Sequence, residues 1–386
     1  MWRVLSGLVF RKKRCVLCGK ESVTISRVIG VCSDCLRSNP DEALKIAMKG
    51  HEESRGQYGL PPEPPRDSGG LRCTMCANEC IIGEGRFGFC GLVKNEGGKL
   101  VRLAGTPDKA ILEWYYDPLP TNCVADWVCP GCTGRGYPKY SYSSGGPEYG
   151  YYNLAVFYGA CNLDCLFCQN WHYRNLTAKL SPTYTAEELA SKVHARVSCI
   201  CYFGGDPSPQ MPHAIKTSEI ALERARAKGR ILRICWETNG LMNREFLKKA
   251  VELSLESGGC IKFDIKAWTP SIYKALTGCD NRPLFENIKY VADKYLHERK
   301  EPPLIVASVL LVPGYVDVEE VRQIARFLAD IDPDIPLSLL AFHPDYLMND
   351  LPPTSTRHAY ECVRAAKEEG LKDVHIGNIW LLGDYY

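Results

Sequence analysis

Three closely spaced cysteines are the residues of this chain with the clearest capacity for chemistry. Cys161, Cys165 and Cys168 follow the pattern C-x3-C-x2-C and precede Gln169-Asn170-Trp171. Three thiolates at this spacing can bind three corners of a [4Fe–4S] cluster, whereas ferredoxin-type electron carriers fill all four corners with cysteine. A cluster that lacks one cysteine keeps one iron open, as catalytic zinc sites keep an open position. The alternative is that packing alone brings the three cysteines together.

The same motif is similar to the signature of radical S-adenosylmethionine (SAM) enzymes, in which the open iron binds SAM. Phe167, directly before the last cysteine, is a common apolar shield in this motif. We therefore predict that Cys161, Cys165 and Cys168 are metal ligands at a catalytic centre, with a [4Fe–4S] cluster and SAM as cofactors.

Length and charge exclude several classes of protein. The 386 residues are enough for two or three domains, and a net charge of +2 favours neither nucleic acid nor a membrane as partner. The apolar runs are all shorter than the roughly 18 residues that a membrane span needs. The apolar segment Met1–Phe10 precedes the basic run Arg11–Arg14, which is the wrong order for a signal peptide. We expect this basic run to be a solvated face, with a docking patch for a protein partner as the alternative.

The 20 cysteines indicate metal sites rather than disulfides. Disulfide scaffolds are typically short secreted chains, and many cysteines here form C-x2-C pairs. We expect a cytoplasmic protein of an anaerobic host, because the predicted cluster is sensitive to oxygen.

The first cysteine group predicts a structural metal site in a module spanning residues 1–50. Cys15, Cys18, Cys32 and Cys35 form two C-x2-C knuckles, which can close a tetrahedron around zinc or a single iron. A nucleic-acid-binding zinc ribbon is the alternative, but basic and aromatic residues are not interleaved there as that role requires.

Residues 51–70 are rich in glycine and proline and predict a linker. Residues 71–150 then carry two more cysteine groups: Cys73, Cys76, Cys80 and Cys90, and Cys123, Cys129 and Cys132. The first of these predicts a second four-thiolate site for iron or zinc. The three cysteines of the other group either take a fourth ligand from elsewhere in the chain or share a metal with the preceding group. We expect Glu113–Asp117 to be an aromatic packing patch, and 133–152 to be a loop lying over another part of the chain.

Residues 151–342 alternate apolar runs with amphipathic stretches. We predict strands at 153–159, 198–203, 231–236, 260–265, 304–312 and 335–342, and helices near 186–197, 214–228, 243–256, 284–298, 317–329 and 355–369. Six strand–helix repeats indicate an α/β fold with parallel strands, a partial (β/α)6 barrel similar to a TIM barrel. In such folds the chemistry lies at the carboxyl ends of the strands, and the cluster motif follows the first strand.

The same positional argument selects further residues for SAM binding. Glycines permit close backbone approach, and a carboxylate can take the ammonium group of SAM. Asp264 and Lys266 also have a simpler interpretation as a buried ion pair, and His343 is expected to be hydrogen-bonded scaffold. The predicted SAM-binding residues are Phe167, Gly204, Gly205, Asp206, Glu237, Thr238, Asn239, Asp264, Lys266, Pro313 and Gly314.

Together, these segments resemble the radical SAM superfamily over roughly residues 73–380. The cysteines from Cys73 to Cys90, Cys168-Gln169-Asn170-Trp171, Val312–Tyr315 and Phe342–Met348 are similar to proteins akin to glycyl-radical activating enzymes. That wider group has Glu-Pro after the second strand, where this chain has Asp206-Pro207. With the amino-terminal knuckles, the Glu113–Cys132 region and the tyrosine-rich loop, the chain resembles the methanogenesis-marker radical SAM methyltransferases.

This resemblance implies C-methylation of the δ carbon (C5) of an arginine in the alpha subunit of methyl-coenzyme M reductase. It also implies cobalamin as methyl carrier, an electron donor, and a tyrosine, here Tyr115, that approaches the open iron. The carboxy-terminal segment 343–386 is then expected to contact cobalamin or substrate, and Asp264 or Asp345 to hold the substrate guanidinium.

One common cobalamin motif, D-x-H-x-x-G, is one residue too short here, in Asp373–Gly377. We therefore predict a terminal strand there and do not assign His375 as a cobalt ligand. Two alternatives to the methyltransferase remain at this stage: an activase that makes a glycyl radical on a partner protein, and a cysteine-rich metal-binding interaction module.

Overall fold

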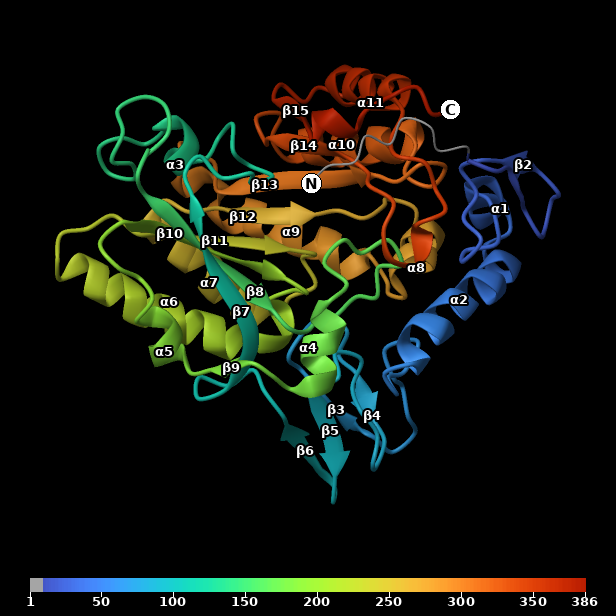
Figure 1. Ribbon diagram of the computed structural model, residues 1–386, viewed down its shortest axis with the longest axis horizontal. Coiled ribbons are helices and arrows are strands. Elements are labelled where there is room, and N and C mark those ends of the chain that lie inside the picture. Colours follow the sequence, from blue (N-terminus) through green and yellow to red (C-terminus); the bar gives the residue numbers. More distant parts are fainter. Residues whose placement is uncertain (1–9) are drawn as a thin grey trace.

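The centre of the computed structural model is a nine-stranded sheet (Figure 1). The structure describes residues 10–386, so nearly all of the predicted Met1–Phe10 segment lies outside the described residues. The strand order is β15-β14-β13-β12-β11-β10-β8-β7-β9, and every pair from β8 to β15 is parallel. The strands are β7 (Ala110–Pro118), β8 (Tyr152–Tyr158), β9 (Thr183–Tyr184), β10 (Val197–Gly204), β11 (Arg233–Thr238), β12 (Ile261–Asp264), β13 (Ile305–Leu311), β14 (Leu337–Ala341) and β15 (Val374–Gly377).

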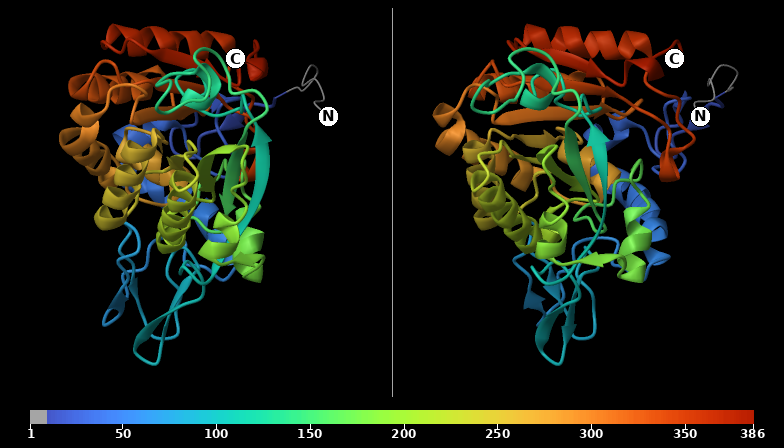
Figure 2. Two further views of the ribbon diagram at one scale, coloured as in Figure 1. Left: turned by 90° about the vertical axis from the view of Figure 1, so that its left-hand side faces the viewer. Right: turned by 60° about the vertical axis from the view of Figure 1, so that its left-hand side comes forward.

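Amphipathic helices follow the parallel strands and lie along the outside of the sheet (Figure 2). Parallel neighbours require such crossovers, and burial on both faces explains why β13 is buried at every residue. The helices are α4 (Tyr173–Lys179), α5 (Ala186–Ala190), α6 (Met211–Arg226), α7 (Arg244–Ser257), α8 (Pro270–Thr277), α9 (Arg282–Tyr295), α10 (Val318–Ile331) and α11 (Thr356–Glu368). The predicted α/β class and its six strand–helix repeats are confirmed.

Of three further expectations about elements, two need correction and one is confirmed. The Glu113–Asp117 patch is part of a strand, β7, which pairs antiparallel with β8. The predicted helix at 186–197 ends as a regular helix at Ala190. The predicted terminal strand at 373–377 is present as β15, parallel to β14.

The amino-terminal part lies beside the sheet, close to α8 (Figure 1). It contains β1 (Lys13–Arg14), β2 (Glu21–Ser22), α1 (Ser33–Ser38) and α2 (Pro40–Gly56). The predicted linker 51–70 is therefore wrong for its first six residues, which are helical. A Pro at the start of a helix followed by acidic residues is a helix-start signal, and Pro40-Asp41-Glu42 supplies it.

Two small hairpins and one helical turn complete the fold. β3 (Leu71–Arg72) pairs with β4 (Ile81–Ile82), and β5 (Val93–Glu96) pairs with β6 (Lys99–Arg102). The segment 119–151 between β7 and β8 contains α3 (Pro130–Thr133) and is called here the β7–β8 segment. No helix among residues 10–386 is long and apolar enough to cross a membrane.

Candidate active site

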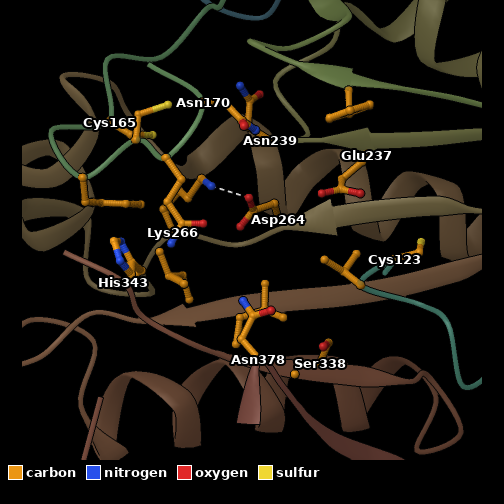
Figure 3. A pocket seen from close by; sticks show the side chains of 18 of the residues that line it. Cys123, Cys165, Asn170, Glu237, Asn239, Asp264, Lys266, Ser338, His343 and Asn378 are labelled. Atoms are coloured by element: carbon orange, nitrogen blue, oxygen red, sulfur yellow. Dashed lines mark hydrogen bonds and ion pairs between the residues drawn. The ribbon is translucent and has the colours of Figure 1, made fainter. Parts of the chain in front are cut away.

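One cavity of about 730 Å³ brings the predicted site together (Figure 3). Side chains from β10 through β15 line it, so the sheet curves around this space. Of the residues predicted for the cluster and SAM, those in the lining are Cys161, Cys165, Phe167, Cys168, Gly204, Gly205, Asp206, Glu237, Thr238, Asn239, Asp264 and Lys266. Residues far apart in sequence therefore converge at the carboxyl ends of the strands.

The three cysteines of the cluster motif form one wall of this cavity. Cys161 and Cys165 are buried and Cys168 is half-buried, directly after β8. Burial raises the pKa of all three thiols, that of Cys165 to about 12, while the nearby cations of Lys266 and Arg174 act in the opposite direction on Cys165 and Cys168. Metal binding deprotonates such thiols. Three thiols that line a cavity, without a fourth cysteine beside them in the lining apart from the distant Cys123, fit a cluster with one open iron.

A buried carboxylate fixes the backbone between these cysteines. Asp164 is fully buried and accepts hydrogen bonds from Ser54 Oγ (2.8 Å) and Arg174 Nη2 (2.6 Å), and His51 Nδ1 lies 2.9 Å from its Oδ2. His51 and Ser54 belong to α2, so the amino-terminal part directly supports the cluster loop. Sequence reasoning missed this role because it assigned residue 51 onward to a linker.

The glycines after β10 are required by the chain's own backbone. Gly204 has φ +108°, and a Cβ there would lie 2.6 Å from Tyr158 N. A Cβ on Gly205 would lie 2.1 Å from Ala160 O. The close approach is thus between the end of β10 and the backbone of β8 and Ala160, whereas the sequence suggested close approach of a ligand.

Asp206 joins this turn to the end of β11. Its carboxylate accepts hydrogen bonds from Ser208 N and Ser208 Oγ, from Thr238 Oγ1 (3.0 Å) and from Asn239 N (2.8 Å). Burial raises its pKa although these donors oppose the shift. These contacts give Asp206 a structural role, and contact with the SAM ammonium group remains a prediction.

The ends of β11 and β12 carry the other polar groups near the cluster thiols. Asn239 Nδ2 donates to Asn162 Oδ1 (2.7 Å) and lies 3.8 Å from Cys161 Sγ. Lys266 Nζ contacts Asp264 Oδ2, as the ion-pair interpretation expected. Burial alone would lower the pKa of Lys266, but Asp264 and Cys165 raise it. A charged ammonium and amide groups at this wall can bind the carboxylate and hydroxyl groups of a ligand.

Two predicted SAM residues do not line the cavity. Pro313 and Gly314 are absent from its lining, and a Cβ on Gly314 would lie 2.3 Å from Thr24 O. The neighbouring Tyr315 is fully buried; its hydroxyl donates to Val31 O (2.9 Å) and accepts from Ser26 N (3.0 Å). The amino-terminal part covers this turn, so the cavity does not support SAM binding by Pro313 and Gly314, which remains a prediction.

Tyr115 lies on the inward side of the sheet without lining the cavity. It pairs with Ala155 of β8, and its ring meets the ring of Phe203, which lines the cavity, edge-on with 6.5 Å between the ring centroids. Burial raises its pKa, as do Asp117, Cys201 and Glu237. Contact with an open iron remains a prediction.

The first cysteine group has the geometry of a mononuclear metal site. The ligand atoms of Cys15, Cys18, Cys32 and Cys35 all lie within 4.8 Å of one another, with Sγ–Sγ distances of 3.7 Å for 15–35 and for 18–32. A tetrahedron with metal–sulfur bonds of about 2.3 Å has edges of about 3.8 Å. Burial opposes ionisation of Cys15, but backbone N–H groups lower its pKa to about 6. These four cysteines fit zinc or a single iron.

The second group lies next to the cluster loop. Cys73 N donates to Cys80 O, Asn78 Nδ2 donates to Asn162 O (2.6 Å), and Ala77 N donates to Leu241 O (2.9 Å). Burial and then the neighbouring thiols raise the pKa of Cys76. Within residues 10–386, however, the first group is the one whose ligand atoms come within single-ion distance. A mononuclear metal at Cys73, Cys76, Cys80 and Cys90 remains a prediction.

The third group lies away from the second group, and its first member, Cys123, lines the cavity. Cys123 shares an apolar cluster with Cys201, Cys235 and Cys260, while Cys129 and Cys132 pack against Leu119. Lys262, which is fully buried, donates to Cys123 Sγ (3.1 Å) and Cys201 Sγ (3.0 Å). This location argues against a metal shared with the second group.

Residues 155–328 match the sequence family described as the Radical SAM superfamily. They contain the cluster cysteines and the strand ends that line the cavity. This part of the chain is a radical SAM domain.

An uncharacterized protein of Methanocaldococcus jannaschii is 29% identical over 319 residues, covering 81% of this chain and 83% of that protein. The isethionate sulfite-lyase activating enzyme of Desulfovibrio desulfuricans is 30% identical over 142 residues, covering 36% of this chain and 40% of that enzyme.

Solved structures resemble parts of this chain more distantly than these sequence relatives do. A domain of a pyruvate-formate lyase-activating enzyme from Bacteroides vulgatus has a TM-score of 0.36 at 20% identity, covering 46% of this chain and 98% of that one. Streptococcus suis SuiB bound to its precursor peptide SuiA has a TM-score of 0.38 at 14% identity, covering 57% of this chain and 47% of that one.

Proposed function

We propose that this radical SAM protein C-methylates the δ carbon (C5) of an arginine in methyl-coenzyme M reductase. The observation that carries the proposed radical chemistry is the wall of three cluster cysteines facing the cavity. The choice of bond and substrate rests on the resemblance to the methanogenesis-marker methyltransferases. An arginine δ C–H bond is unactivated, so acid–base catalysis cannot functionalise it, whereas radical cofactor chemistry can.

The residues of the cavity fit the cluster and SAM. Cys161, Cys165 and Cys168 would bind three irons, and Lys266 and Asn239 would face the SAM bound at the fourth. Once bound, the cluster and SAM would together supply a carbon radical that removes hydrogen from an unactivated carbon. Phe167, 2% exposed, and the surrounding buried side chains exclude water and oxygen from that position.

Cobalamin does not fit inside the same cavity. A volume of about 730 Å³ is of the size that holds one small-molecule ligand, and cobalamin is several times larger than SAM. His375 lines the cavity, but its ring is stacked on Trp127 at 4.6 Å. Cobalamin as methyl carrier therefore rests on the resemblance alone.

Exposed apolar side chains near the cavity support a protein as the substrate. Ile379 and Trp380, which follow the edge strand β15 and line the cavity, are 55% and 56% exposed, and Tyr115 of β7 is 52% exposed. Exposed apolar residues beside a cavity are typical of peptide-binding surfaces. A segment of methyl-coenzyme M reductase would lie there and insert its arginine.

A glycyl-radical activating enzyme is the second candidate, favoured by the similarity to the isethionate sulfite-lyase activating enzyme. Product analysis separates the two. The reconstituted protein is incubated anaerobically with SAM, a reductant, cobalamin and the reductase peptide, and the nucleoside products are quantified. S-adenosylhomocysteine formed in step with the modified peptide supports the methyltransferase; 5′-deoxyadenosine alone, with a persistent radical on a partner protein, supports the activase.

A further inference from the structure

The cavity has a second polar region away from the cluster thiols. Asp126 of the β7–β8 segment, Ser338 of β14 and His375 of β15 all line it, and we name these three residues the polar floor. In Figure 3, Ser338 and Cys123, three residues before Asp126, lie on the side of the cavity opposite Cys165. The cavity therefore runs from the cluster wall to the polar floor.

Contacts between neighbouring residues hold the polar floor together. Ser338 and His375 are direct partners in the β14–β15 ladder. The Trp127 ring stacks on His375 with an interplanar angle of 16°, and Trp127 Nε1 donates to Asp373 Oδ1 (2.8 Å). Asp126 directly precedes Trp127, so the same contacts fix the carboxylate beside β14 and β15.

Two groups of the polar floor lack partners. Ser338 is 1% exposed, and its Oγ has no hydrogen-bond partner within the described chain. The Asp126 carboxylate likewise makes no hydrogen bond or ion pair with residues 10–386. A buried hydroxyl without a partner costs free energy, so a ligand that satisfies it gains affinity.

Each of the other carboxylates of the cavity has a partner within the chain. Asp206 is bound by Ser208, Thr238 and Asn239, Glu237 by Lys262, and Asp345 by Tyr346 N. Asp264 contacts Lys266 through Oδ2, whereas its Oδ1 is buried without a partner among the described residues. Asp264 and Asp345 were the residues that the sequence favoured for holding a guanidinium. Asp126 is left as the cavity carboxylate without a protein partner among the described residues.

We propose that the polar floor binds the guanidinium of the substrate arginine. The Asp126 carboxylate accepts two N–H groups from one edge of the guanidinium, and Ser338 Oγ accepts a third. A guanidinium presents five N–H donors in a planar fork, which matches this set of acceptors better than an ammonium does. This inference rests on the proposed function.

Binding at the polar floor also orients the substrate. The δ carbon of arginine is bonded to the guanidinium group. With the guanidinium on Asp126, the carbon chain extends through the cavity, between the polar floor and the cluster wall. Asp126 and Ser338 are thus positioning residues that set which side-chain carbon is exposed to the radical.

Peptide binding without turnover tests the inference. Affinities of the reconstituted protein are measured for a reductase peptide with arginine and for the same peptide with neutral citrulline. Citrulline cannot form the charge-assisted hydrogen bonds of the guanidinium, so the arginine peptide should bind about tenfold more tightly or better. Asp126→Asn should reduce this ratio to near one, Ser338→Ala should reduce it partly, and Asp126→Glu should restore part of it. Asp108→Asn, a substitution of an exposed aspartate elsewhere, is the matched control and should not change it.

The outcomes separate this inference from the proposed function. Equal binding of both peptides by the wild-type protein, or undiminished discrimination by both Asp126→Asn and Ser338→Ala, overturns the polar floor as a guanidinium site. Because the assay needs no catalysis, a protein that discriminates the peptides but never methylates them contradicts the proposed function and supports the polar floor. If Asp126→Asn fails to fold, Ser338→Ala decides the question.

Discussion

At the scale of single residues, the three cluster cysteines are not interchangeable with the other buried cysteines of the chain. Cys165 faces the cavity, whereas Cys362 is fully buried in α11 and lies outside the cavity lining. We expect Cys165→Ala to lose the reducible cluster and to reduce SAM cleavage to background. Iron content, the EPR spectrum of the reduced protein and 5′-deoxyadenosine formation measure this.

The matched control for that experiment is Cys362→Ala, which removes a buried thiol of the same size. It should retain the cluster and SAM cleavage. Cleavage by Cys165→Ala at the wild-type rate would show that the catalytic cluster lies elsewhere.

The sequence predicted which residues near the strand ends line the cavity, but it did not predict which residues they contact. The rule that chemistry lies at the carboxyl ends of parallel strands selected Glu237, Asn239 and Lys266, and all three line the cavity. The same rule selected Pro313 and Gly314, which the amino-terminal part covers instead. Nothing in the sequence selected Asp126 as a site residue, because a single aspartate in an irregular segment is not part of a recognisable motif.

At the scale of elements, helix α2 supports the cluster loop through Asp164. Replacing His51 with leucine removes one polar partner of a fully buried carboxylate. We expect His51→Leu to lower the free energy of unfolding by about 1–3 kcal/mol and to reduce cluster retention. Denaturant unfolding and iron content per chain measure both effects.

His297→Leu is the control, since His297 is exposed after α9. It should leave stability and iron content within error of the wild type. An unchanged His51→Leu protein would mean that α2 does not stabilise the cluster loop.

The β7–β8 segment is fastened to the sheet by a buried ion pair. Both side chains are fully buried, and Arg233 Nη2 lies 2.8 Å from Glu148 Oε2, which also accepts from Ser198 Oγ (2.6 Å). Burial alone would raise the pKa of Glu148, but Arg233 and the other donors hold it below its usual value of 4.5. A carboxylate with a depressed pKa stabilises the fold fully above that usual value, and this stability is lost as the pH falls through the lower folded-state pKa.

Glu148→Gln should therefore be less stable than the wild type at neutral pH, and the difference should shrink in acid. Because one partner of a buried pair is lost, we expect about 3–5 kcal/mol near pH 7. Unfolding free energies measured from neutral to acidic pH test this. A difference that is constant with pH would show that Glu148 is not ionised in the folded protein.

Elements with a regular apolar period were predictable, and those fixed by tertiary contacts were not. The strands β8 and β10 to β14 have apolar runs that need burial on both faces, which makes them visible in the sequence. β7 reads Glu113-Trp114-Tyr115-Tyr116-Asp117, and its strand form depends on pairing with β8. The Gly/Pro-rich composition after residue 56 concealed the last turns of α2.

At the scale of the whole molecule, side-chain contacts close to the first cysteine group join the amino-terminal part to the radical SAM domain. Close to that site, Arg37 donates to Asp317 through Nη1 and Nη2 (both 2.8 Å), and Tyr315 bonds to Ser26 and Val31. A short segment of this kind depends on its metal for a fixed structure. We expect one zinc or iron per chain at Cys15, Cys18, Cys32 and Cys35.

Removing that metal with a chelator should expose residues 15–35 to limited proteolysis and lower the melting temperature. Elemental analysis and mass spectrometry of the fragments measure this. A metal-free protein with unchanged melting and protection would show that the four cysteines do not bind a structural metal.

The central claim is that this fold directs a radical to the δ carbon of a protein arginine. The most direct test is anaerobic incubation of the reconstituted protein with SAM, reductant, cobalamin and the reductase peptide, followed by tandem mass spectrometry of the peptide. We predict a mass gain of one CH2 group, located on the δ carbon of arginine and absent with Cys165→Ala. An unmodified arginine in a reaction that consumes SAM, or a methyl group on another atom, would contradict it.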